Sequence, residues 1–269
     1  MTNLQTRVVS AIVLAIPVLA LTWLGGTWFR VLAAVIALVI LYEWLLISGR
    51  LQWRSGLVPF AGLAAGFLLL VAGRPETIVF GILAAGLLAT ALEAAFRGDG
   101  RATSAGYAYA ALSGVALAEL RGDGLAGLWT ILFLFATVWA TDILAYFVGR
   151  AVGGPKLAPS ISPGKTWSGA VGGAVGGTVA GLSVAAAVGH FHMALVPLAA
   201  VISVAAQIGD LFESAVKRRH GVKDSSQLIP GHGGVMDRVD GLVAAAILLY
   251  LVLIAAGGFD DPAMRLFPV

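Results

Sequence analysis

The sequence predicts an all-α fold: a polytopic integral membrane protein with about nine transmembrane helices. Hydrophobic residues make up 59% of the 269 residues and charged residues 12%, whereas a soluble domain carries about 25% charged residues. Nine apolar stretches recur along the chain without the alternation of barrel strands, and most approach the roughly 20 residues that cross a bilayer as a helix. They fall at 8–25, 31–48, 56–72, 77–96, 105–119, 127–148, 168–189, 193–213 and 241–258.

The first and fifth stretches are the least typical. Arg7 precedes the first, as in a signal peptide, but no small-x-small cleavage pattern follows it, so we expect a retained helix. The fifth is the weakest prediction, because it is short and contains Tyr107, Tyr109 and Glu119.

The seventh stretch carries Gly169, Gly173, Gly177 and Gly181 at a spacing of four. One helix face is therefore stripped of side chains, which predicts close packing on another helix.

The distribution of Lys and Arg orients the predicted helices. With the N terminus in the cytoplasm and the C terminus outside, Arg30, Arg74, Arg121 and Arg265 fall outside and the other 13 of the 17 fall inside. This bias is what the positive-inside rule expects. Cysteine is absent, which excludes disulfides and thiol chemistry and fits a bacterial inner membrane.

Polar residues concentrate in the second half of the chain. We expect residues 1–126 to form a lipid-facing scaffold and residues 127–269 a catalytic region with cytoplasmic loops at 149–167 and 214–240. Glu43 and Glu93, near the inner ends of scaffold helices, are interpreted as snorkelling or interhelix-bonded side chains.

The densest polar run extends from Asp210 to Asp240. If the eighth helix continues past Asp210, then Glu213, Ser214 and Lys217 share its face. Asp237 and Asp240 stand at the start of the ninth helix, and the loop between could bring Asp237 to Asp210. Two carboxylates can hold Mg²⁺, which bridges phosphates, and Lys217, Arg218, Lys223 and Arg238 supply charge for a polyphosphate. The run predicts phosphoryl or nucleotidyl transfer with the active site facing the cytoplasm.

Further phosphate contacts are expected from two loops. In one, Gly233 and Gly234 offer backbone N–H groups to an anion, and His232 is a candidate phosphate contact. In the other, Lys165 suits a phosphate as a point charge, and a helix beginning near Thr166 would present free N–H groups. Ser162 belongs to the same segment.

Asp142 lies well inside the sixth stretch, where an ionisable residue is a functional candidate by default. It could instead be a structural residue that pairs with Arg150 or bonds a neighbouring helix, and both interpretations stay open.

The run that begins at Ser214 resembles the signature of the phosphatidate cytidylyltransferases, or CDP-diacylglycerol synthases. It reads SxVKRxxxxKDxSxxIPxHGGVxDRVD. The segments 142–150, 162–167 and 209–214 are also similar to that family. Ser168 departs from it, because the family often has Glu at this position.

The resemblance implies a membrane enzyme that joins CTP and phosphatidate to give CDP-diacylglycerol and pyrophosphate. It implies Mg²⁺ at Asp210 and Asp237, with a monovalent cation such as K⁺. It adds Asp224 and Asp240 to His232 and the four basic residues of the loop as catalytic candidates. The expected partners are CTP, phosphatidate and the lipid bilayer, with a homodimer left open and no nucleic acid.

Two other functions remain as alternatives. The enzyme could use CTP on a different membrane lipid, such as a polyprenol or an ether lipid. An ion-coupled transporter would also place Asp and Glu within the membrane, but its two halves usually resemble each other, and no such repeat is found.

Overall fold

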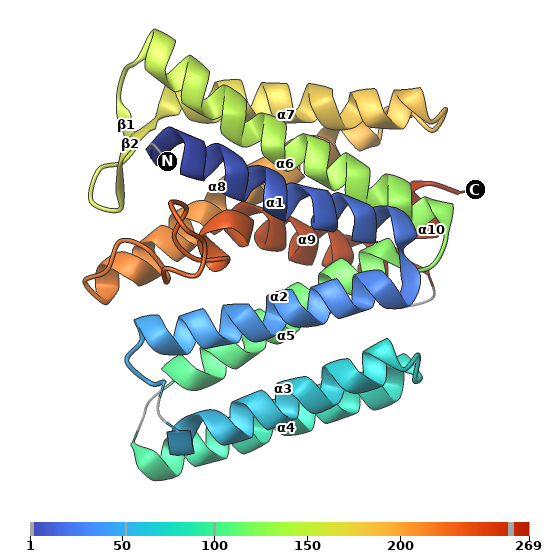
Figure 1. Ribbon diagram of the computed structural model, residues 1–269. Coiled ribbons are helices and arrows are strands. Elements are labelled where there is room, and N and C mark those ends of the chain that lie inside the picture. The colour runs from blue at the N-terminus through green and yellow to red at the C-terminus, as the bar shows by residue number, and fades with distance from the viewer. Residues whose placement is uncertain (1–2, 52, 99–100, 258–260, 269) are drawn as a thin grey trace. The chain divides into compact units, whose positions relative to one another are not determined.

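The computed structural model describes residues 3–51, 53–98, 101–257 and 261–268, and within them the chain is mostly helical. Figure 1 labels the elements. They are α1 (Asn3–Leu24), α2 (Gly26–Ile47), α3 (Trp53–Val71), α4 (Glu76–Arg97), α5 (Ala102–Arg121), α6 (Leu125–Val152), β1 (Lys156–Ala158), β2 (Ser162–Thr166), α7 (Trp167–Ala187), α8 (Leu195–Arg219), α9 (Met236–Gly257) and α10 (Ala263–Leu266).

The prediction of a helical membrane protein is confirmed in its coarser form. In the described part of the chain, six helices are long and apolar enough to cross a membrane: α2, α4, α6, α7, α8 and α9. The weak fifth stretch forms the 20-residue helix α5, which is not among these six.

A small antiparallel sheet accompanies the helices, and the all-α prediction did not include it. β1 pairs with β2 between α6 and α7, with Lys156 opposite Thr166 and Ala158 opposite Ser162. The backbone N–H of Trp167 donates to the Pro155 carbonyl and closes the hairpin at its base. This hairpin was not predicted, because strands of three and five residues are too short to show a periodic pattern.

The chain forms two compact units. The first consists of Met1–Ala118 and His220–Arg238, and the second of Glu119–Arg219 and Val239–Val269. In the first unit, α3 packs on both α2 and α4. Tyr107 fixes part of this core, because its hydroxyl donates to the Leu83 carbonyl at 3.1 Å.

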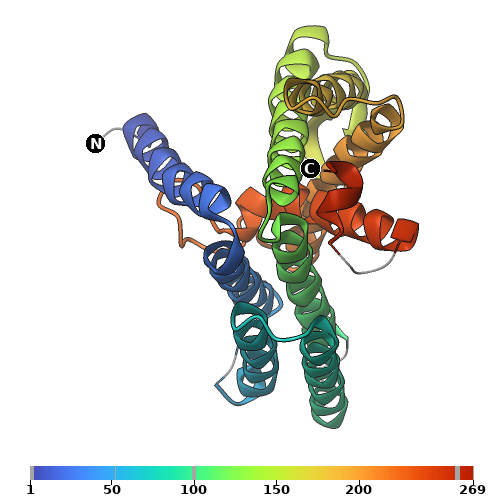
Figure 2. The ribbon, with the colours of Figure 1, turned by 90° about the vertical axis from the view of Figure 1, so that its right-hand side faces the viewer.

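The second unit is built on the contact of α6 with α7, which lie side by side in Figures 1 and 2. The four glycines at spacing four are all buried, as the sequence predicted for a packing face. A Cβ at Gly173 would lie 2.7 Å from the Thr141 carbonyl oxygen, so only glycine permits this approach. The Thr141 hydroxyl also bonds the Ser203 hydroxyl at 2.5 Å and thereby ties α6 to α8.

Candidate functional site

A cavity of about 650 Å³ opens in the second unit where α6, the hairpin, the start of α7 and α8 meet. Five of the predicted site residues line it: Asp142, Ser162, Lys165, Thr166 and Asp210. The rest of the lining consists of Ala145, Tyr146, Gly149, Arg150, Gly153, Gly154, Lys156, Leu157, Gly164, Gly169, Ala170 and Gln207.

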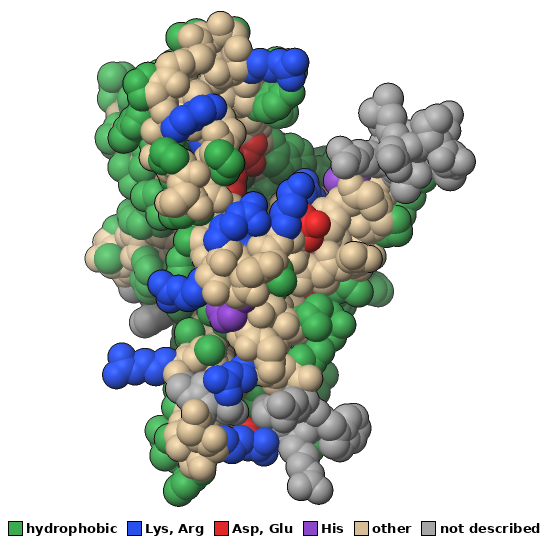
Figure 3. Space-filling model, turned by 90° about the vertical axis from the view of Figure 1, so that its left-hand side faces the viewer, with side chains coloured by type: hydrophobic (Ala, Val, Ile, Leu, Met, Phe, Trp, Pro, Cys, Tyr) green, Lys and Arg blue, Asp and Glu red, His purple; other side chains and the backbone are tan. Residues whose placement is uncertain are grey.

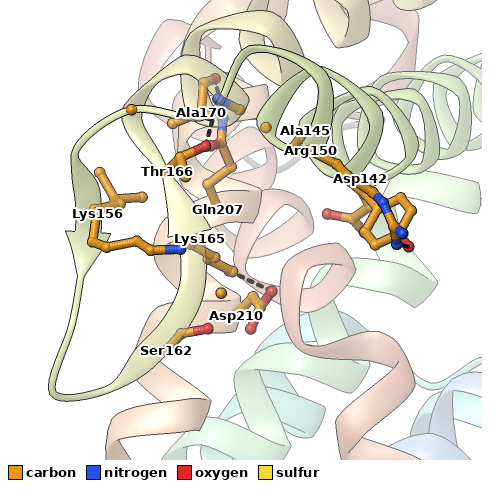
Figure 4. A pocket seen from close by; sticks show the side chains of 17 residues that line it. Asp142, Ala145, Arg150, Lys156, Ser162, Lys165, Thr166, Ala170, Gln207 and Asp210 are labelled. Carbon is orange, nitrogen blue, oxygen red and sulfur yellow. Dashed lines mark hydrogen bonds and ion pairs between the residues drawn. The ribbon is translucent and has the colours of Figure 1, made fainter.

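Lys165 and Asp210 form an ion pair inside this cavity. Lys165 reaches from β2 to α8, where its Nζ lies 2.5 Å from Asp210 Oδ2, as Figure 4 shows. The Ser214 hydroxyl donates to the other carboxylate oxygen of Asp210 at 3.3 Å. The side chains of Lys165 and Asp210 remain 28% and 32% exposed, so a ligand in the cavity can reach both.

Thr166 holds the junction of the hairpin with α7. It is the N-cap of α7, and its hydroxyl accepts a hydrogen bond from the Gly169 N–H at 3.1 Å. The predicted helix start near Thr166 is therefore confirmed. Ser168, where the family often has Glu, donates to the Gly153 carbonyl and lies 3.1 Å from the Thr166 hydroxyl. In this chain it helps to close the hairpin.

Asp142 brings a second carboxylate to the same cavity. It points from α6 toward the space that Lys165 and Asp210 share (Figure 4) and interacts electrostatically with both, and with Asp240. Arg150 donates instead to the Tyr146 hydroxyl at 3.0 Å. Because Asp142 lines the cavity, its functional interpretation is favoured over the structural one. That interpretation stays a prediction.

Farther along α8, Lys217 is packed against Glu213, with Nζ 3.4 Å from Oε1. Both side chains are nearly buried, at 10% and 1% exposure. Lys217 was expected to face a polyphosphate. Within its unit it pairs with Glu213, and its contact with a phosphate stays a prediction. Arg218, one residue on, is exposed.

In the first unit, the segment that precedes α9 is folded around the carboxylate of Asp237. Oδ2 accepts hydrogen bonds from the backbone N–H and the hydroxyl of Ser225 and from the backbone N–H of Gly234, each at 2.8 Å. Gly233 adopts a φ of +83°, which disfavours any side chain. A Cβ there would also lie 2.8 Å from Asp237 Oδ2.

The other predicted residues of this segment are distributed around it. His232 Nδ1 lies 2.8 Å from the Ser10 hydroxyl of α1, which fixes the orientation of the ring. Lys223, Asp224 and Arg238 are exposed. The Gly234 N–H, expected to face an anion, is directed to Asp237, and a phosphate contact at Gly233 or Gly234 stays a prediction.

Glu43 is the residue whose importance sequence reasoning missed. It is buried on α2, at 0% exposure, and accepts four hydrogen bonds, three from the segment before α9 and one from Met236, the first residue of α9. Glu43 does not snorkel, because it is fully buried. Only Met236 among its four partners belongs to a helix, and the partners are more than 180 residues away. The one available signal was a carboxylate within an apolar helix, which is costly unless it is paired.

The donor set suits a hard cation such as Mg²⁺. Asp142, Asp210 and Asp240 repel one another electrostatically, and a cation among them would relieve that repulsion. In the described part of the chain, no three His, Asp or Glu side chains gather closely enough to hold an ion by themselves. Mg²⁺ does not require such a cage, because it commonly uses one or two carboxylates with water and substrate phosphates. Asp210 lies in the second unit and Asp237 in the first, so their sharing of an ion stays a prediction.

Figure 3 shows Lys and Arg side chains, in blue, exposed at the surface. Arg150 and Lys156, which line the cavity, are among the exposed residues of the second unit. A cavity with lysines on one wall and carboxylates on another is equipped to bind a polyphosphate together with a cation.

Comparison with known proteins gives a consistent result. Residues 5–256 match the model of a family described as the cytidylyltransferase family. Phosphatidate cytidylyltransferases from Brucella abortus and Brucella melitensis are each 51% identical to the chain, over 93% of it and 93% of their own length. A phosphatidate cytidylyltransferase from Pseudomonas aeruginosa is 34% identical over 96% of the chain and all of its own length.

Proposed function

The chain belongs to the cytidylyltransferase family, and from this membership we propose that it transfers the cytidylyl group of CTP to phosphatidate. The products are CDP-diacylglycerol and pyrophosphate. The observation that carries this proposal is 51% identity, over nearly the whole chain, to phosphatidate cytidylyltransferases. The cavity with Lys165, Asp210 and Asp142 supports it, because it gathers the charges that a triphosphate substrate requires.

The reaction needs little proton transfer. A phosphate oxygen of phosphatidate is already anionic, and it forms a new bond to the α-phosphorus of CTP while the bond from that phosphorus to the bridging oxygen breaks. Pyrophosphate leaves with the electron pair. Catalysis therefore depends mainly on holding two anionic substrates together and on neutralising charge as it develops.

The chain's own residues supply part of this neutralisation. Lys165 and Lys156 extend from the hairpin into the cavity, and Arg150 approaches from α6. We assign the phosphates to these cations, with Lys165 exchanging its contact with Asp210 for one with the substrate. Thr166 keeps the start of α7 in place beside them.

Asp210 and Asp237 would hold Mg²⁺, with a monovalent cation such as K⁺ as a second ion. A bound Mg²⁺ supplies Lewis-acid neutralisation of the phosphates. Both carboxylates are oriented by donors of their own units, Ser214 for Asp210 and Ser225 for Asp237.

We further propose nine membrane-spanning helices in a bacterial inner membrane, with the N terminus and the catalytic loops in the cytoplasm. The helices α1 to α9 and the 13 of 17 positive residues on the inner side support this topology. Reporter fusions after residues 50, 100, 155 and 225 are expected to report the cytoplasm, and fusions after 26, 74, 123 and 191 the outside. A cytoplasmic report at 191 with an outside report at 225 would contradict the proposal.

Activity is tested on the purified protein in detergent with labelled CTP, phosphatidate and Mg²⁺. We expect a labelled CDP-lipid with pyrophosphate in equal amount. A polyprenyl phosphate and a phosphorylated ether lipid serve as competing acceptors, because a different lipid specificity would leave the same nucleotide chemistry. Faster transfer to either acceptor than to phosphatidate would overturn the substrate assignment, and no transfer to any of them would overturn the function.

A further inference from the structure

We propose that Glu43 is a positioning residue of this enzyme: from α2 it holds the segment that leads into α9, and through that segment it orients Asp237. The expected effect on turnover rests on the proposed function. The contacts from which the inference is argued do not depend on that function. All of these residues belong to the first unit.

The Glu43 carboxylate is fully engaged by one short stretch of chain. Oε1 accepts from the Ser226 hydroxyl at 2.6 Å and from the Val235 N–H at 2.9 Å. Oε2 accepts from the Met236 N–H at 2.6 Å and from the Ser225 hydroxyl at 3.1 Å. Hydrogen bonds to an ionised acceptor are about twice as strong as neutral ones, and this acceptor is completely buried.

The same stretch of chain also contacts Asp237. The hydroxyl of Ser225 lies 3.1 Å from Glu43 Oε2 and 2.8 Å from Asp237 Oδ2, so its single proton bridges two carboxylates. The backbone N–H of Ser225 donates to the same Asp237 oxygen. Displacement of Ser225 would therefore move the donors that orient Asp237.

Gly234 shows how tightly the segment lies on Glu43. A Cβ at this position would overlap both the Ser225 hydroxyl and Oε1 of Glu43. The backbone of the segment thus rests directly on the carboxylate, and even an alanine methyl group has no space. Several residues of the polar run are accordingly explained by Glu43: Ser225 and Ser226 donate to it, and Gly234 makes room for it.

A positioning role predicts effects on turnover that exceed effects on substrate binding. Glu43→Gln keeps the shape of the side chain but turns an amide NH₂ toward groups that are themselves donors. We expect kcat to fall by roughly 10- to 100-fold, as for a catalytic group displaced by about 1 Å, with KM for CTP changed by less than about threefold. The matched control is Glu93→Gln, because Glu93 is a carboxylate of α4 whose ion pair is with Arg97 on its own helix. The control is expected to keep wild-type turnover.

The mobility of the segment gives a readout that does not depend on activity. The chain has no cysteine, so Leu228→Cys, at a site that is 51% exposed, can carry a single nitroxide label. We expect Glu43→Gln to increase the mobility of this label and Glu93→Gln to leave it unchanged. An inactive wild-type protein would refute the proposed function and leave the mobility result to decide the role of Glu43.

Ser226→Ala provides a milder perturbation if Glu43→Gln does not fold. It removes one donor to Oε1, and we expect a kcat loss of roughly threefold to tenfold, since it deletes one hydrogen bond to a charged group, and a smaller gain in label mobility. Where both variants fold, the double variant should be no slower than Glu43→Gln, because both act through one contact. Wild-type kcat in Glu43→Gln, or a lowered kcat with an unchanged label spectrum, would overturn the proposal.

Discussion

Replacement of Lys165 by Met separates a contribution to stability from a contribution to catalysis. Met is of similar length but carries no charge, so the variant removes the ion pair of the hairpin with Asp210 on α8. The two side chains are 28% and 32% exposed, and pairs so accessible to water contribute about 0–1 kcal/mol to stability. We therefore expect the unfolding temperature to fall by no more than a few degrees.

The expected effect on turnover is much larger. Lys165 lines the cavity beside Asp142 and Asp210, and its ammonium group is assigned to a phosphate of CTP. Removal of one preorganised charge at a reacting group costs about 3 kcal/mol, which corresponds to roughly a 100-fold loss of kcat/KM for CTP. Lys165→Arg should lose less, because it keeps the charge but replaces a point charge with a planar fork.

The assay measures initial rates of CDP-lipid formation at limiting and saturating CTP, together with thermal unfolding in the same detergent. Arg97→Met is the matched control. Arg97 forms an ion pair of the same length, 2.5 Å, with Glu93, and its side chain is 36% exposed. This variant should change stability as little as Lys165→Met and should keep the wild-type rate. Normal kinetics of Lys165→Met at limiting CTP would refute the reasoning and leave Lys165 as an ordinary charge of the hairpin.

Two further predictions concern the carboxylates and the helix contact. Asp210→Asn and Asp237→Asn should each lower turnover by orders of magnitude. The double variant should be little worse than either single variant, because both residues are assigned to one ion. Near wild-type turnover of either variant at low Mg²⁺ would exclude the replaced residue from the metal site. Gly177→Ala should destabilise the protein by about 1–3 kcal/mol, because its methyl group would overlap the Thr141 hydroxyl and crowd the Thr137 carbonyl. Thermal unfolding measures this loss, and an unchanged unfolding temperature would show that α6 and α7 do not approach so closely.

The family resemblance and the positions of most helices could be predicted from the sequence, because both depend on residues that are close together along the chain. Apolar stretches of membrane length predict helices wherever they occur, and the glycines at spacing four predicted the face of α7 that packs on α6. The helix start at Thr166 was also local, since the hydroxyl and the N–H that it caps are three residues apart. The polar run from Asp210 to Asp240 identified the family by its residue order alone, without any knowledge of its fold.

The partners of the charged residues were decided only by the tertiary structure. Lys165 and Asp210 are 45 residues apart, and Glu43 reaches donors 182 to 193 residues away. A carboxylate in an apolar helix indicates that a partner must exist, because burial without one is costly. It does not indicate which partner, because that depends on which backbone N–H groups the fold brings to it. The hairpin of β1 and β2 escaped prediction for a related reason: its strands are too short for a periodic pattern, and it forms where the ends of α6 and α7 bring them together.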